Sequence, residues 1–367
     1  MVRFNIWINI RGINISSNNT IRILITKRTM EKLKTLELFS GYGTASFALK
    51  QLGIDFECIG YSDIDKYANQ CFKQNHGSKE LGDVTKINPK DLEDFDLLTG
   101  GFPCQTFSVA GKGMGELDSR GTLFNEIIRI AEVKNPRYML LENVKGLMSK
   151  KHKPTFDKII SELYRIGYFV KWKVLNTKEH GIPQNRERVF FCCFRYWNDF
   201  CNFKFPDKEE LKIFLKDIVE TEVDKKYYLS NKMKDYVLAT GTKGFSVKPE
   251  IDRDIAKTIT ATVHKMHRAG MDNYLSIKNA TNKGYYIQRL EPKSDGTTNT
   301  ISTVQKDNWL ATSLAIRKLT PKECFRLQGF LNDEINLNDL SNTQRYKLAG
   351  NGWDINLVSK IFRGMLK

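Results

Sequence analysis

The chain has 367 residues, of which 41% are apolar, and this length is sufficient for one large domain with a buried core and a smaller second domain. A formal net charge of +16 favours a polyanionic partner such as nucleic acid, although a basic protein without such a partner would carry the same charge. Seven cysteines, an odd number without a Cys-x-x-Cys pair, argue against a disulfide framework and a structural zinc site, and no run of about 18 apolar residues predicts a membrane span.

The first 29 residues are rich in Asn, Ile and Arg and do not read as a secretory signal. They lack both an apolar central segment and a small-residue cleavage site. Met30 stands shortly before the first predicted strand. We therefore predict that residues 1–29 are a dispensable extension or reflect a misplaced start, and that the protein is cytoplasmic with reduced thiols.

Strand-like and helix-like runs alternate from residue 35 onward. Strands joined through helices have crossover connections, which place the strands parallel in one sheet and cover both faces of that sheet. We therefore predict an α/β fold, a doubly wound domain with a mainly parallel sheet. The expected strands are 35–39, 56–61, 138–141, 169–175 and 189–194, with an apolar strand-like run at 95–98, a turn at 41–43, and helices at 44–52, 123–133, 156–166 and 354–366.

The alternating pattern ends after Trp197 and is replaced by short β-prone pieces separated by Gly, Asn, Asp and Lys. Between Lys225 and Leu310 there are 15 Lys or Arg against 8 Asp or Glu, a net charge of +7 that exceeds this stretch's share by length. We interpret residues 198–316 as a smaller, irregular β-rich domain, and residues 30–197 and 317–367 as the larger domain. A basic insertion of solvated loops is the alternative.

Cys104 and Glu142 are the first candidate catalytic residues. Cys104 lies on a glycine- and proline-containing turn just after the apolar run 95–98, and Glu142 follows the predicted strand 138–141. The carboxyl ends of parallel strands meet at one edge of a sheet, where ligands bind. A thiol and a carboxyl placed there can act as nucleophile and acid on an electron-poor ring. The alternative is an incidental or buried cysteine.

Five ordered segments resemble the signature motifs of the DNA cytosine-5 methyltransferases. The resemblance covers roughly residues 35 to 367, and the order and spacing match throughout. It implies the S-adenosylmethionine-dependent methyltransferase fold, with residues 198–316 as the target recognition domain. The segments are Leu36 to Gly43, Gly101 to Gln105, Glu142 to Val144, Gln184 to Arg188 and Arg317 to Phe330.

The resemblance implies S-adenosylmethionine as the cofactor. Ser46 stands where a dinucleotide fingerprint has its third glycine, so a pyrophosphate site is disfavoured. Asp63 is placed for the ribose hydroxyls, and Asp83 resembles the family residue that contacts the adenine amino group, although an isolated Asp after a strand is usually a helix cap. The implied cofactor-binding residues are Phe39, Ser40, Gly41, Gly43, Asp63, Ile64, Asp83, Val84, Pro103 and Asn351. We assign no metal.

The implied reaction begins with addition of the Cys104 thiolate to carbon 6 of a flipped-out cytosine, which makes carbon 5 nucleophilic. Glu142, as a protonated carboxyl at ring N3, would stabilise the adduct, and a raised pKa in an enclosed site would favour that role. Arg186 and Arg188, at a spacing of two, resemble the family arginines at the flipped nucleotide. A salt bridge with Glu187 is the alternative for either arginine.

Substrate contacts are expected from six further residues. Lys265 is assigned to a phosphate and Arg268 to a guanine, because they lie in a segment that mixes base-edge donors and acceptors with cations. His264 and His267 in the same segment are more typical of surface or hydrogen-bonding residues than of metal ligands. The substrate-binding residues are Gln105, Ser108, Asn143, Gln184, Lys265 and Arg268.

The C-terminal motif departs from the family pattern. Where the family usually has Gly-Asn-Ser, this chain has Gly350-Asn351-Gly352 followed by Trp353. The serine contact is therefore lost, and Trp353 is expected either to pack or to cover the cofactor.

The resulting prediction is a site-specific DNA cytosine-5 methyltransferase. The expected partners are double-stranded DNA and a cognate restriction endonuclease that acts separately. A solitary or phage-borne enzyme is the alternative to the restriction system, no membrane is involved, and a monomer is expected. An RNA (transfer RNA) cytosine-5 methyltransferase and an inactive DNA-binding regulator remain as alternative functions, although intact Cys104, Glu142, Arg186 and Arg188 argue against the regulator.

Overall fold

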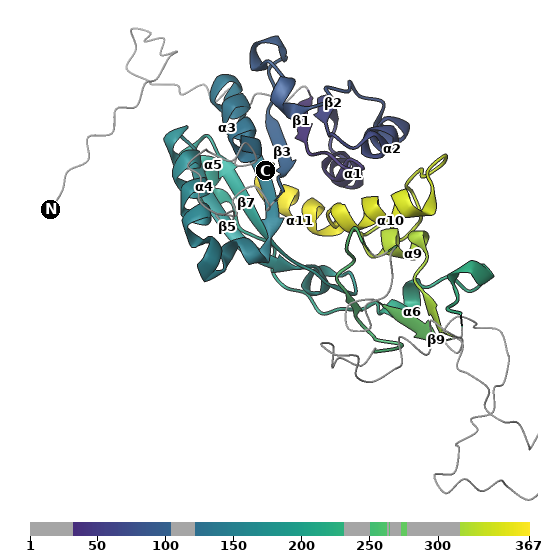
Figure 1. Cartoon of the computed structure of the whole chain (residues 1–367). Helices are drawn as coiled ribbons and strands as arrows, with labels where there is room; N and C mark the ends of the chain where they lie inside the picture. The colour runs from purple at the N-terminus through teal and green to yellow at the C-terminus, as the bar shows by residue number, and fades with distance from the viewer. Residues whose placement is uncertain (1–31, 104–121, 231–249, 263, 265–272, 277–315) are drawn as a thin grey trace, which may run out of the picture. The chain divides into compact units, whose positions relative to one another are not determined.

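The structure is a computed structural model that describes residues 32–103, 122–230, 250–262, 264, 273–276 and 316–367. Within it, Leu33–Lys367 form one compact unit (Figure 1). The predictions for residues 1–29 lie outside the described residues, and the division into two domains stays a prediction. In the described part of the chain, no helix is long and apolar enough to cross a bilayer.

The centre of this unit is a six-stranded sheet with the strand order β2-β1-β3-β4-β7-β5. The first four strands of this order are parallel to one another, and β7 is antiparallel to both β4 and β5. The prediction of a mainly parallel α/β sheet is therefore confirmed. The strands are β1 (Leu33–Leu38), β2 (Phe56–Ser62), β3 (Leu97–Gly101), β4 (Tyr138–Val144), β5 (Phe169–Asn176) and β7 (Glu187–Phe194).

The one reversed strand of the sheet, β7, follows β5 without an intervening α-helix, and the sequence analysis predicts no helix between these two strands. Between β5 and β7 the chain forms only a 3₁₀ turn at Thr177–His180 and the two-residue strand β6 (Gln184–Asn185). A parallel connection needs a dozen or more residues and usually a helix, whereas an antiparallel pair can be joined by a short loop. The short connection therefore sets β7 antiparallel, and β7 lies between β4 and the edge strand β5.

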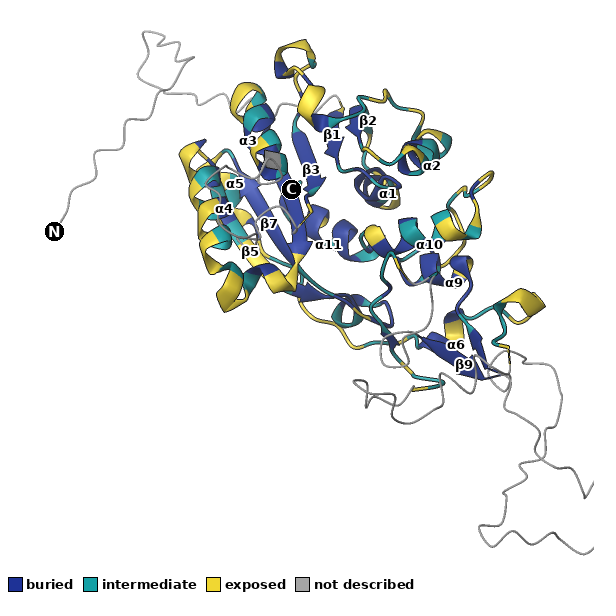
Figure 2. Ribbon diagram, in the orientation of Figure 1, coloured by how far each residue is buried: buried dark blue, intermediate teal, exposed yellow. Residues whose placement is uncertain are grey.

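Helices cover both faces of the sheet, as expected for a doubly wound domain (Figures 1 and 2). Met139 and Leu141 of β4 belong to a core cluster with α3 and α4, whereas Tyr138 and Leu140 belong to a cluster with α1 and α11. This alternation follows from the period of two in side-chain direction along a strand. The covering helices are α1 (Thr44–Gln51), α3 (Thr122–Lys134), α4 (Lys153–Arg165) and α11 (Ile355–Met365).

Helix α2 (Lys66–His76) is absent from the predicted elements, although its end signals are present in the sequence. Asp65 caps the helix by accepting a hydrogen bond from the Tyr67 N–H at 2.9 Å, and Gly77 ends it at a φ of 69°. An Asp at the N-cap and a left-handed Gly after the last turn are standard helix boundaries.

A second difference concerns Phe39, which is predicted as the last strand residue but has a φ of 53°. The chain turns there into the segment Gly41 to Gly43, called the glycine loop below.

The described part of residues 198–316 contains short elements, as the sequence analysis expects. Strand β8 (Ala256–Lys257) pairs parallel with β6, and β9 (Tyr274–Ser276) pairs antiparallel with β10 (Ile316–Lys318). The remaining helices are α5 (Trp197–Asn202), α6 (Leu215–Ile218), α9 (Pro321–Arg326) and α10 (Asn342–Asn351). The pairing of β8 with β6 brings this region directly beside the motif that contains Arg186.

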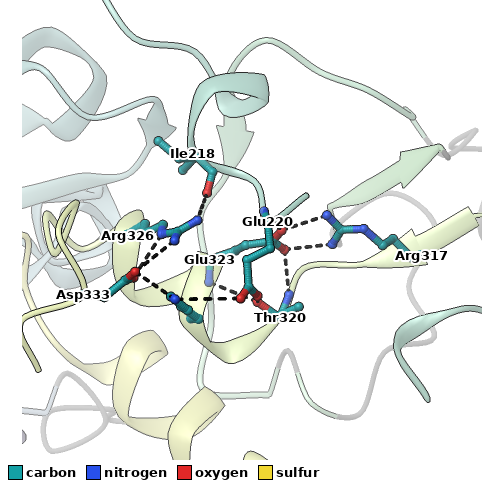
Figure 3. Close-up of polar contacts among 8 residues, drawn as sticks. Ile218, Glu220, Arg317, Thr320, Glu323, Arg326 and Asp333 are labelled. Carbon is teal, nitrogen blue, oxygen red and sulfur yellow. Dashed lines mark hydrogen bonds and ion pairs between the residues drawn. The ribbon is translucent and has the colours of Figure 1, made fainter. Parts of the chain in front are cut away.

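A buried ion pair organises the start of the motif at 317–330 (Figure 3). Arg317 and Glu323 are both fully buried, with Nη2 of the arginine 2.7 Å from Oε1 of the glutamate. The same carboxylate accepts hydrogen bonds from the backbone N–H groups of Glu220 at 2.7 Å and Thr320 at 2.8 Å. These bonds satisfy a charge that would otherwise be costly to bury. They tie segments before and after residues 231–315 to helix α9.

Candidate active site

A cavity of about 450 Å³ lies at the carboxyl ends of the parallel strands. Its walls come mainly from the last residues of β1, β2, β3 and β4 and those that follow them, from the start of β7, and from the turn between α10 and α11. This is the edge at which ligands bind in open α/β sheets. The predicted site residues that line it are Phe39, Ser40, Gly41, Asp63, Ile64, Asp83, Val84, Pro103, Glu142, Asn143, Arg186, Arg188 and Asn351.

Five predicted site residues lie outside the described part of the chain. Cys104, Gln105 and Ser108 follow Pro103, the last described residue before the gap at 104–121, and Lys265 and Arg268 belong to the undescribed stretch 265–272. Their assigned roles stay predictions.

The glycine loop is held open by its own backbone conformation and by Asp63. Gly41 has a φ of 56°, and its N–H donates to Oδ2 of Asp63 at 2.9 Å. The other carboxylate oxygen of Asp63 accepts the Asp65 N–H at 2.9 Å, and burial raises the pKa of Asp63. Gly43 has a φ of 87° and is absent from the cavity wall; a Cβ there would lie 2.4 Å from Nε2 of His76. Gly43 therefore shapes the turn, whereas Gly41 and Asp63 face the cavity.

Ile64 and Asp83 stand at the cavity beyond β2. Ile64 is 87% exposed although it is apolar, so its side chain is available to a ligand. Asp83 accepts hydrogen bonds from the Thr85 N–H at 3.0 Å and the Thr85 hydroxyl at 2.9 Å, and these bonds lower its pKa. Asp83 is therefore a cap of the following 3₁₀ turn, which was the alternative expectation, and it lines the cavity as well.

Glu37 is a cavity residue that the sequence analysis did not select. It is buried in β1, and one of its oxygens accepts hydrogen bonds from both the N–H, at 2.9 Å, and the hydroxyl of Ser46. Burial raises the pKa of Glu37 to about 7. The available signal was an acidic residue between two leucines, Leu36 and Leu38, in a predicted strand. Ser46 thus anchors the start of α1 to β1 at the position where a third glycine would be expected.

Glu142 and Arg188 form the polar centre of the cavity. Nε of Arg188 lies 2.9 Å from Oε1 of Glu142, and Glu142 is only 7% exposed. Burial raises the pKa of Glu142, while the charges of Arg188 and Arg186 and a hydrogen bond from the Trp353 side chain act in the opposite direction. The net result is a carboxyl that takes up a proton more readily than an exposed glutamate.

Arg186 faces the cavity but bonds mainly to backbone carbonyls. Its guanidinium donates to the carbonyl oxygens of Ile259 at 2.9 Å, Gly350 at 3.1 Å and Gly352 at 2.8 Å. Burial lowers its pKa to about 9. The salt bridge with Glu187 that was the alternative is absent from the described residues, because Glu187 pairs with Lys145 at 2.8 Å. Arg186 therefore joins three chain segments at the cavity wall.

Gln184 and Asn143 use their amides for the fold. Gln184 is fully buried outside the cavity wall; its Nε2 donates to the Leu327 carbonyl at 2.5 Å, and its Oε1 accepts the Ile259 N–H at 3.2 Å. Asn143 lines the cavity, donates to the Phe102 carbonyl at 2.9 Å and accepts the Val144 N–H at 2.8 Å. Asn143 thereby fixes the chain one residue before Pro103. The predicted substrate contacts of both residues remain untested.

Gly352, which stands where the family usually has serine, lies against Tyr42 of the glycine loop. A Cβ at Gly352 would lie 1.9 Å from Cε1 of the buried Tyr42 ring. Tyr42 also donates a hydrogen bond from its hydroxyl to the Trp353 carbonyl. Tyr42 thus occupies the space that a side chain at position 352 would need.

We expect Gly352→Ser, which restores the residue usual in the family, to destabilise the protein by roughly 1–3 kcal/mol through overpacking. Urea unfolding of both proteins measures this loss. In a Tyr42→Ala background the same change should cost little, because the ring is gone, whereas Tyr42→Phe should not relieve it. Equal costs in all three backgrounds would contradict the clash.

Protonation of His76 should destabilise the fold at acidic pH. Its Nε2 bonds to the Tyr42 carbonyl at 3.2 Å and its Nδ1 to Nζ of Lys50 at 3.0 Å, so the neutral ring uses both nitrogens. Burial and Lys50 lower its pKa to about 3. Below about pH 6.5 the unfolded chain binds a proton at His76 that the folded chain does not. The contribution of His76 to the free energy of unfolding therefore decreases as the pH is lowered, by roughly 2 kcal/mol at pH 5.

His76→Gln removes this proton uptake, so on going from pH 7 to pH 5 the variant should gain roughly 2 kcal/mol of stability relative to wild type. The raised pKa values of Glu37 and Asp354, both about 7, act in the opposite direction, because the folded state then binds the extra proton. These groups are common to both proteins and cancel in the difference. Urea unfolding between pH 7 and 5 measures the two slopes, and parallel slopes would refute the assignment.

Comparisons with known proteins agree on one family. Residues 33–367 match the family described as C-5 cytosine-specific DNA methylase. The chain is 33% identical over 339 residues to the type II methyltransferase M.HhaI of Haemophilus parahaemolyticus, covering 92% of this chain and 96% of that protein. It is 33% identical over 342 residues to the type II methyltransferase M.HaeII of Haemophilus aegyptius, covering 92% and 94%. A solved structure of a DNMT2 mutant from Spodoptera frugiperda has a similar fold, with a TM-score of 0.68 at 22% identity, covering 92% of this chain and all of that one.

Proposed function

We propose a residue-level mechanism for this chain, which belongs to the C-5 cytosine-specific DNA methylase family and is a DNA cytosine-5 methyltransferase. The proposal rests on one observation, the cavity that brings Pro103, Glu142 and Arg188 together with the glycine loop. Cys104 directly follows Pro103 in the sequence. The nucleophile and the acid are therefore proposed to act on a base that enters this cavity.

The cavity residues fit S-adenosylmethionine better than a phosphorylated cofactor. Glu37, Asp63 and Asp83 all contribute to the wall, and this accumulation of carboxylates disfavours a polyanion but suits the cationic sulfonium and ammonium groups. The exposed Ile64 offers an apolar face for adenine, and Asp63 a carboxylate for the ribose. Phe39, Ser40, Gly41, Val84, Pro103 and Asn351 would line the rest of the site, and bound S-adenosylmethionine would supply an electrophilic methyl group.

The chain's own residues account for the activation of cytosine. The Cys104 thiolate forms a bond to carbon 6 and shifts an electron pair to carbon 5, while protonated Glu142 donates to ring N3 and neutralises the developing charge. Arg188 pairs through Nε with Oε1 of Glu142 at 2.9 Å and so anchors one oxygen of the carboxyl. After methylation, loss of the carbon 5 proton returns the electron pair, and the carbon–sulfur bond breaks. No described residue is assigned as the base for that proton.

Duplex DNA hides the cytosine, so the base must rotate out of the stack. We propose that residues 198–316 form the target recognition domain, with Lys265 on a phosphate and Arg268 on a guanine, and that residues 30–197 and 317–367 form the catalytic domain. Arg186 would couple the two, because it bonds to Ile259 as well as to Gly350 and Gly352. Gln105, Ser108 and Asn143 are proposed to meet the flipped nucleotide.

A place in a restriction-modification system is proposed from the names of the relatives, which include type II methyltransferases. Orphan methyltransferases, such as M.SPRI of Bacillus phage SPR at 29% identity, support the alternative of a solitary enzyme. A cognate nuclease would act separately.

The proposal is tested by incubating the protein with tritiated S-adenosylmethionine and either genomic duplex DNA or transfer RNA. We expect label in DNA alone, and bisulfite-type mapping should place it at carbon 5 of cytosine within one short recurring sequence. Label in RNA only, or methylation of another base, would overturn the proposal.

A further inference from the structure

Trp353 occupies a position that no motif assigns. It lies in the turn between α10 and α11 and lines the cavity. Its indole lies against Gly101, where a Cβ would be 2.8 Å from Nε1 and 3.0 Å from Cζ2, and edge-on to Phe190 with ring centroids 6.2 Å apart. An aromatic side chain of this size is therefore accommodated only because residue 101 is glycine.

The two neighbours of Trp353 are also the two strand partners of Glu142. In the sheet, Glu142 pairs with Gly101 of β3 and with Phe190 of β7. The indole thus spans the positions on both sides of Glu142, and its side chain acts to lower the pKa of that buried carboxyl. Three strands and the C-terminal turn converge on this one acid.

The backbone of Trp353 is fixed independently of its side chain. Its carbonyl accepts the Tyr42 hydroxyl, and its N–H donates to the Thr44 hydroxyl at 3.4 Å. Both partners belong to the glycine loop and the start of α1. The indole is therefore held on a rigid base, which is the requirement for a group that orients another group.

We propose that Trp353 is a positioning residue for Glu142, holding the carboxyl by its indole N–H in the orientation from which it donates a proton to cytosine. This inference rests on the proposed role of Glu142. Arg188 contacts one carboxylate oxygen through Nε, and a single contact leaves the carboxyl free to rotate about its terminal torsion, which has broad preferences. The indole N–H supplies the second contact and fixes that torsion.

The donor also affects the proton on Glu142. A hydrogen bond donated to a carboxylate favours the charged form, so its loss should raise the pKa of Glu142. The charged groups that face Glu142 from the described residues, Arg188 of β7 and Arg186 just before it, stay in place when only the indole is changed. A change in the pH profile would therefore report on the indole itself.

The test compares Trp353→Phe with wild type and with Trp172→Phe, a matched control on β5 outside the cavity wall. Phenylalanine retains the aromatic packing on Gly101 and Phe190 but has no N–H. Single-turnover methyl transfer is followed at saturating S-adenosylmethionine and duplex DNA across the pH range. We expect Trp353→Phe to lower the maximal rate about 10-fold and to move the alkaline limb to higher pH, with KM for S-adenosylmethionine changed less than about twofold.

Two results would overturn the inference. One is an unchanged rate and alkaline limb, and the other is a raised KM for S-adenosylmethionine at unchanged maximal rate, which would make Trp353 a cofactor cover. An inactive wild type would instead refute the proposed function. If Trp353→Phe fails to fold, Gly101→Ala displaces the indole by its added Cβ, and the same shift of the limb is expected.

Discussion

Cys104→Ser is expected to lower methyl transfer by roughly 10³-fold or more while duplex DNA binding changes little. A serine hydroxyl is a far weaker nucleophile than a thiolate at neutral pH. Binding should persist because the basic stretch between Lys225 and Leu310 is unaltered. Rates are measured with tritiated S-adenosylmethionine and affinities by duplex anisotropy.

A target duplex that contains 5-fluorocytosine provides a second measurement. Fluorine replaces the carbon 5 hydrogen whose loss as a proton releases the enzyme. The bond between sulfur and carbon 6 therefore persists, and a covalent complex accumulates. We expect wild type to form this complex and Cys104→Ser to form none. Cys201→Ser serves as the control, because Cys201 is an exposed thiol on α5. Robust methyl transfer by Cys104→Ser would rule out the covalent mechanism.

The sequence was sufficient to locate the cavity because its walls are strand ends. The predicted strands 56–61 and 138–141 are followed by Asp63 and Glu142, and both carboxyls line the cavity. In a parallel sheet this result follows from topology alone. Arg186 and Arg188 likewise both reach the cavity, as their spacing of two predicted.

The contacts that support these residues were not predictable in the same way. Trp353 meets Gly101 across about 250 residues of sequence, and Gln184 bonds to Leu327 across 143. Such long-range pairs leave no local periodicity or spacing. The reversal of β7 is similar, because antiparallel pairing depends on a connection whose shortness is apparent only when both strand boundaries are known. Local patterns therefore identified the chemical groups, and the fold determined which groups hold them.

Glu142→Gln is expected to reduce methyl transfer by roughly 10²–10⁴-fold, the range typical of a lost general acid. Glutamine has the same shape as glutamate but no acidic proton, so it cannot neutralise ring N3 when the Cys104 bond forms. Burial, which raises the pKa of Glu142, makes the protonated form accessible to wild type. The rate of wild type should therefore fall as pH rises through that raised pKa, and Glu142→Gln should lack this alkaline limb.

Glu142→Asp separates the loss of the proton from the loss of geometry. Aspartate keeps an acidic proton but draws it back by one methylene from Arg188, whose Nε lies 2.9 Å from the native carboxylate. We expect the residual rate of Glu142→Asp to depend on pH, whereas the residual rate of Glu142→Gln should show no alkaline limb. S-adenosylmethionine affinity, measured by calorimetry, should stay within a few-fold in both, because Glu142 is proposed to contact the cytosine ring and not the cofactor. If Glu142→Gln transferred methyl groups within about tenfold of wild type, the acid would have to be sought elsewhere in the cavity.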